Sequence, residues 1–68
     1  MMADADVLRR LTAQREAIAH LRSRADWHRE VAQDFEIGGM RIAAMRHWQA
    51  ASIASQAADR EAAPEAGE

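Results

Sequence analysis

The sequence contains no cysteine, no tyrosine and no lysine, and it has one proline and three glycines among 68 residues. Without cysteine, the chain can form neither a disulfide nor a thiolate zinc site. Valine, isoleucine and threonine are few and never clustered, so the runs typical of β-strands are missing. These absences exclude a disulfide-stapled fold and argue against a sheet.

Alanine, glutamate, glutamine and arginine dominate instead, and all four favour helices. The composition therefore predicts a small all-α protein. Arginine as the sole cation (nine residues), together with abundant alanine, suggests a GC-rich genome such as that of an actinobacterium or its phage. The acidic N-terminus resembles no signal peptide, and no apolar run is long enough to span a bilayer, so we expect a cytoplasmic protein with no membrane partner.

The apolar pattern predicts three helices. The first covers about 4–22, is capped by Asp4 or Asp6, and carries the apolar positions Val7, Leu11, Ile18 and Leu21. The second covers about 26–37, because the next apolar positions lie about 120° away on a helical wheel, far more than the roughly 20° per heptad of supercoil drift. A break near residues 23–26 explains this shift. The alternative is one continuous helix to Phe35, since no glycine or proline enforces a stop.

The dipeptide Gly38-Gly39 predicts a tight turn, because glycine readily adopts the left-handed conformation that ends a helix. The third helix follows at about 40–62 and forms an antiparallel hairpin with the second. We therefore expect one domain over residues 1–62 and a disordered acidic tail at 63–68.

Two faces of the third helix suggest two neighbours. We expect Ile42, Met45, Trp48 and Ile53 to face inward, and we favour a core pairing of Trp27 with Trp48. The alternative is that the two tryptophans anchor an interface with a partner. The opposite face carries small residues at heptad spacing, which would let two helix backbones approach closely. This face predicts an interface with a second copy of the chain, and it consists of Ala43, His47, Ala50, Ala54 and Ala57.

His20, His28 and His47 are the residues with the most obvious site chemistry, but none form an i, i+4 metal pair. We interpret all three as surface or edge residues, although two copies of His47 meeting across a dimer would form a pH-sensitive contact. No nucleophile with an oriented base is present. We therefore expect no enzyme activity, metal, cofactor or small-molecule substrate.

Residues 9–29 hold six arginines against Glu16 and Asp26, a local excess of four positive charges. This segment offers an alternative function in nucleic-acid binding. The residues available for phosphate contacts would be Arg9, Arg10, Arg15, Arg22 and Arg24. Because the helix after the turn has only Arg41 and Arg46 before Arg60, it makes a poor recognition helix, and we favour a solvated basic face.

The segment from Trp27 to Trp48 resembles a tetratricopeptide-type helical hairpin. Trp27, Ala32, Phe35, Gly38 and Ala44 stand where that family has its aromatic, alanine and glycine positions. The segment is also similar to small helical proteins of actinobacteria with an aromatic–helix–turn–helix layout. The likeness covers about a third of the chain and one repeat unit, so it implies a hairpin scaffold and an interaction role, but no peptide-binding groove.

A chain of this size is only marginally stable alone, and its usual staples are disulfides, a metal or a second subunit. The sequence therefore predicts a non-enzymatic protein–protein interaction module, a homodimeric small adaptor or regulator. The alternatives are a DNA-associated accessory factor using the arginine-rich segment, and a phage-encoded inhibitor of a host protein.

Overall fold

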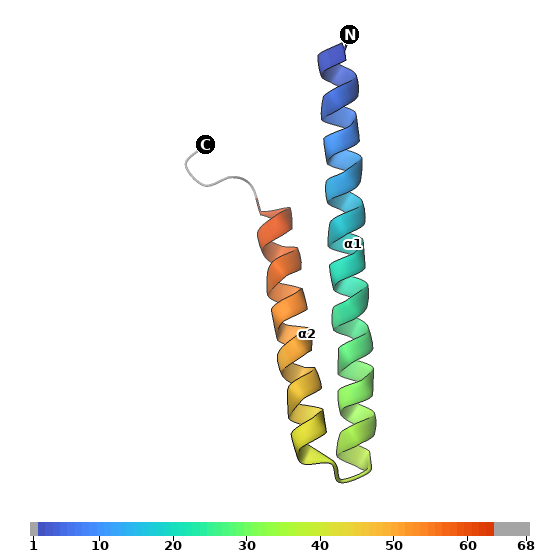
Figure 1. Ribbon diagram of the computed structural model, residues 1–68, viewed down its shortest axis with the longest axis vertical. Coiled ribbons are helices and arrows are strands. Elements are labelled where there is room, and N and C mark those ends of the chain that lie inside the picture. Colours follow the sequence, from blue (N-terminus) through green and yellow to red (C-terminus); the bar gives the residue numbers. More distant parts are fainter. Residues whose placement is uncertain (1, 64–68) are drawn as a thin grey trace.

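In the computed structural model the protein is an antiparallel hairpin of two long helices (Figure 1). Helix α1 spans Met2–Ile37 and helix α2 spans Arg41–Ala62. The structure describes residues 2–63, and side chains from Asp4 onward. The acidic tail predicted at 63–68 lies, apart from Ala63, outside these residues. No helix within the described part of the chain is long and apolar enough to cross a membrane.

The all-α prediction is confirmed, but the prediction of three helices is wrong. Helix α1 runs without a break through Ser23 and Asp26. Its positions that face α2 alternate in spacing between four and three residues, which is the heptad pattern of paired helices. This row consists of Gln14, Ile18, Leu21, Ala25, His28, Ala32 and Phe35, all buried or half-buried, and Val31 beside it is also half-buried. Ala25, His28 and Ala32 continue this row between the larger apolar residues, so the helix keeps the same face toward α2 without a break.

The core between the helices is built mainly from alanine. Helix α2 contributes a matching heptad row of Ala44, His47, Ala51, Ala54 and Ala58. Ala32 of α1 is fully buried, at 0% exposure, and among the described residues no large side chain reaches that degree of burial. Small side chains let helix backbones pack closely, but each one removes little apolar area from water. The hairpin therefore has a narrow core.

The predicted inward face of the third helix is wrong. Ile42, Met45 and Ile53 are exposed at 70%, 58% and 66%, and Trp27 is exposed at 56%. Trp48 is half-buried, and its indole Nε1 donates a 2.7 Å hydrogen bond to Glu36 Oε1 rather than facing Trp27. The alanine row occupies the inward face because it keeps the heptad register with α1, whereas Ile42 and Met45 fall outside that register.

The turn forms at Gly38 and Gly39, where the sequence predicts it. The Gly39 N–H donates to the Glu36 carbonyl at 3.0 Å, and the Met40 N–H donates to the Phe35 carbonyl at 2.8 Å. With Gly39 at φ 79°, this pair of bonds is a Schellman motif, which satisfies the last carbonyls of α1. Helix α2 then begins without a side-chain cap.

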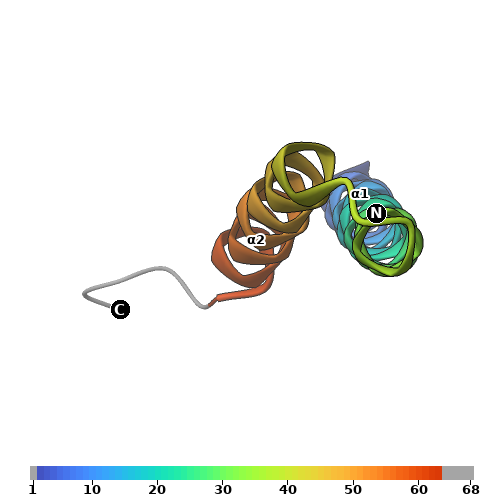
Figure 2. The same ribbon diagram turned by 90° about the horizontal axis from the view of Figure 1, so that it is seen from below.

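Helix α1 is longer than α2, so its N-terminal part extends beyond the end of α2 (Figure 1). The contact between the two helices ends near Gln14, whose side-chain Nε2 donates a hydrogen bond of 2.6 Å to the Glu61 carbonyl in the last turn of α2. We call residues 4–13 the overhang. It carries exposed Val7, Leu8 and Leu11. Seen along its length, the described part of the chain consists of the two helices side by side, with no further layer on either face (Figure 2).

Candidate interaction surface

The two sides of the seam between α1 and α2 differ in polarity. One side holds a shallow groove of about 260 Å³. It is lined by Leu21, Arg24 and His28 of α1 and by Ala50, Ile53, Ala54 and Ala57 of α2. A second depression, of about 300 Å³, shares Arg24 and His28 with this groove and adds exposed Trp27. We call the set Leu21, Trp27, Ala50, Ile53 and Ala57 the apolar flank.

The opposite side of the seam is polar. A depression of about 200 Å³ is lined there by Arg22, Ala25, Asp26, Arg29 and Ser55. Arg29 and Asp26 form an ion pair at 2.8 Å, with both side chains largely exposed. Such a surface pair contributes about 0–1 kcal/mol of stability. Because these charges pair with each other, the polar side offers a partner little apolar surface, whereas the apolar flank leaves exposed apolar side chains beside the seam.

The alanines predicted as a dimer interface pack against α1 of their own chain. Ala54 is buried in the seam, whereas Ala43, Ala50 and Ala57 are half-buried at its edge. The seven-residue spacing of these three places them on the side of the apolar flank. The structure therefore divides the predicted interface: Ala54 and His47 lie within the seam, and Ala50 and Ala57 also line the open groove.

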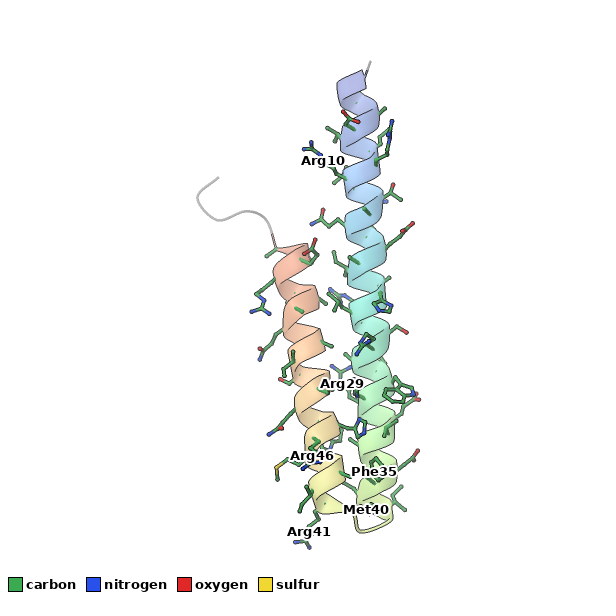
Figure 3. All side chains as sticks on the ribbon, viewed as in Figure 1. Arg10, Arg29, Phe35, Met40, Arg41 and Arg46 are labelled. Carbon is green, nitrogen blue, oxygen red and sulfur yellow. The ribbon has the colours of Figure 1, made fainter. Side chains whose placement is uncertain are left out.

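The histidines form the least expected feature of the seam. His28 of α1 and His47 of α2 are half-buried, and their Nδ1 atoms lie 2.9 Å apart. Phe35 stacks on His47 with ring centroids 5.5 Å apart, and Trp27 meets His28 edge-on at 4.9 Å. Phe35 lies near the turn (Figure 3), and its contact with His47 shows that its ring faces α2. His47 thus pairs with a histidine of its own chain.

Sequence reasoning missed this pair because histidine was treated as a surface residue. The signal was present in the spacing: His28 lies seven residues from Leu21 and from Phe35, and His47 lies seven residues from Ala54. Each histidine therefore continues a heptad row. His20 does not, and it is exposed. Within the described part of the chain, no group of three or more histidine and acidic side chains could hold a metal ion.

The arginines proposed for nucleic-acid contacts are all exposed on α1. Arg15 and Arg22 lie seven residues apart and follow the polar side of the seam, while Arg10 and Arg24 follow the other side. Arg10 lies on the overhang, beyond the end of α2 (Figure 3). Because Arg9 points between the two sides, the set is spread around the helix and does not gather into one basic face.

Comparisons of the chain with protein-family models, with curated proteins and with solved structures found no match. The resemblance of residues 27–48 to a tetratricopeptide-type hairpin stays a prediction.

Proposed function

We propose that this protein is a non-enzymatic interaction module, a small adaptor or regulator that pairs with a second copy of itself through the apolar flank. One observation carries the proposal: the seam buries alanines while large apolar side chains remain in solvent. A chain this small gains little stability from so narrow a core. Covering the exposed apolar side chains with a second chain would supply the missing burial.

The shape of the apolar flank favours another hairpin as the partner. The small side chains of Ala50 and Ala57 line the groove together with Ile53, and Trp27 lines the adjoining depression. Trp27 and Ile53 are exposed at 56% and 66%. Two helical hairpins that pack face to face form a four-helix bundle, a common stable arrangement of such units. Exposed tryptophan beside a groove is also typical of residues that contribute most to binding energy.

The decisive test compares two isoleucines on the same helix. Ile53 lies on the apolar flank, whereas Ile42 lies outside it, and their exposures are similar, at 66% and 70%. We expect the wild-type protein to sediment at twice the 7.6 kDa mass of the chain. Ile53→Glu should weaken this association by at least about tenfold, the equivalent of about 1.4 kcal/mol. Ile42→Glu should leave it nearly unchanged.

Ala50→Glu extends the test to the floor of the groove, where a buried carboxylate would shift the protein to monomer or unfold it. Circular dichroism of Ile53→Glu distinguishes lost association from lost helix, because its exposed side chain makes little contribution to the hairpin itself. A wild-type protein that stays monomeric at high concentration would overturn self-association. Equal association of the Ile53→Glu and Ile42→Glu variants would overturn the choice of surface.

A further inference from the structure

The His28–His47 pair is the one place where imidazole rings from both helices meet inside the seam, among the residues that the structure describes. Its two Nδ1 atoms are close enough, at 2.9 Å, for a hydrogen bond. In a neutral pair, one ring must carry its proton on Nδ1 and donate it, while the other accepts with its unprotonated Nδ1. The pair therefore links α1 to α2 only in particular protonation states.

One proton added to the neutral pair is tolerated, because a charged ring can still donate from Nδ1 to the neutral ring opposite. The Phe35 ring that stacks on His47 at 5.5 Å favours a single positive charge as well. A second proton removes the acceptor. Both Nδ1 atoms are then donors facing each other, and two positive charges are held 2.9 Å apart in a half-buried seam.

We propose that the His28–His47 pair is a pH-sensitive latch, which keeps α1 and α2 together while it holds at most one proton and releases them when it takes up a second. Both rings belong to the same chain, so the latch acts on the hairpin itself and does not depend on self-association. Because the buried core residues are alanines, the seam buries little large apolar surface that could offset this repulsion.

The charges around the pair do not offset the repulsion that a second proton would cause. From α1, Arg24 lines the same groove as His28 and adds positive charge, and His20 lines the adjoining depression. From α2, Arg46 precedes His47, and no carboxylate occurs between Arg41 and Ala58. Two carboxylates of α1 near the pair are engaged elsewhere, since Asp26 pairs with Arg29 and Glu36 accepts from Trp48. The other two, Glu30 and Asp34, are exposed and lie outside the heptad row of α1 that faces α2.

Removal from water lowers the pKa of His28 below its usual 6.5, and His47 and Arg24 lower it further. The folded hairpin then binds fewer protons than the unfolded chain, so the stability that the pair contributes while His28 is neutral is present above about pH 6.5 and is lost as the pH falls through and below that value. For each extra proton taken up on unfolding, the folding equilibrium constant falls by up to about tenfold per pH unit.

The experiment measures thermal unfolding by circular dichroism at about pH 7.5 and about pH 5.5, which bracket the ordinary histidine range. We expect a lower melting temperature at the acidic value for the wild-type protein and for His20→Gln, which removes an exposed histidine. The variants His28→Gln and His47→Gln leave a single ionisable ring in the seam, and they should lose most of that difference.

Titration of the wild-type imidazole protons by nuclear magnetic resonance gives a second readout that requires no folded variant. Coupled rings should titrate in two steps separated by more than about one pH unit. The latch would be overturned if both glutamine variants kept the full wild-type pH dependence. It would equally be overturned if the two rings titrated independently near the ordinary value.

Discussion

At the scale of single residues, alanine makes most of the buried contact between the two helices. Ala25, Ala44, Ala51 and Ala58 are each exposed at only 1–2%, and Ala32 is completely covered. A methyl group in such a position contributes little by its own transfer from water, but it sets the distance between the helix axes. The side chains around the seam, including the histidine pair, can meet only because that distance is short.

Replacing Ala32 by leucine should therefore destabilise the hairpin. The larger side chain must push the helices apart or adopt a strained rotamer, at a cost of about 1–3 kcal/mol. The measurement is urea unfolding followed by circular dichroism at one fixed protein concentration. Ala19→Leu is the control, because it makes the same change at an exposed position of α1 and should alter stability by less than about 0.5 kcal/mol. An Ala32→Leu variant as stable as the wild type would contradict close packing around this residue.

The histidine pair illustrates what residue-level reasoning could and could not predict. Heptad spacing alone places His28 and His47 in facing rows, so their burial was predictable in principle. Their 2.9 Å contact was not, because it depends on which turn of α2 lies beside which turn of α1. That alignment is fixed by the length of the connection and the Schellman turn, and not by either histidine.

At the scale of elements, the turn is where the sequence predicts it, whereas the predicted break in α1 is absent. Two adjacent glycines are a strong local signal, and α1 ends at Ile37, immediately before them. The predicted break near residues 23–26 rests on the shifted position of Trp27, Val31 and Phe35, but Trp27 is 56% exposed and belongs to no core row, whereas Phe35 continues the row of α1. A prediction based on large apolar residues gives the wrong helix face here, because the core between the helices is built mainly from alanine.

The two glycines of the turn should respond differently to the same substitution. Gly39 has φ 79°, a left-handed conformation that costs other residues about 1–2 kcal/mol, so Gly39→Ala should lower stability by that amount. At Gly38 an added Cβ would meet the Asp34 and Phe35 carbonyl oxygens at 3.6 and 3.7 Å, which is ordinary contact. Gly38→Ala should be neutral or stabilising, by up to about 1 kcal/mol.

Urea unfolding of the two glycine variants measures this difference directly. Because both substitutions add one methyl group to the same turn, general effects of composition cancel between them. Equal stabilities would mean that Gly39 is not held in the left-handed conformation, and would count against the Schellman motif as the device that ends α1.

The whole molecule is a thin, elongated object. Its extents are 57 × 24 × 10 Å and its radius of gyration is 16.4 Å, against about 11 Å for a compact domain of this length. So flat a shape leaves both broad faces of the hairpin open to solvent (Figure 2). It also offers two geometries for self-association: side by side along the apolar flank, or end to end through the overhang.

Small-angle X-ray scattering distinguishes these geometries. Pairing along the apolar flank doubles the mass while the longest dimension stays close to the 57 Å of one chain, because the long axes lie alongside each other. Pairing through Val7, Leu8 and Leu11 of the overhang joins the chains at their ends, so the longest dimension should approach twice that value. We expect the first result, since the flank offers a groove lined by Ile53 and an adjoining depression lined by Trp27, whereas the overhang is a single helix. A dimer of nearly doubled length would show that the chains associate through the overhang, and would contradict association along the apolar flank.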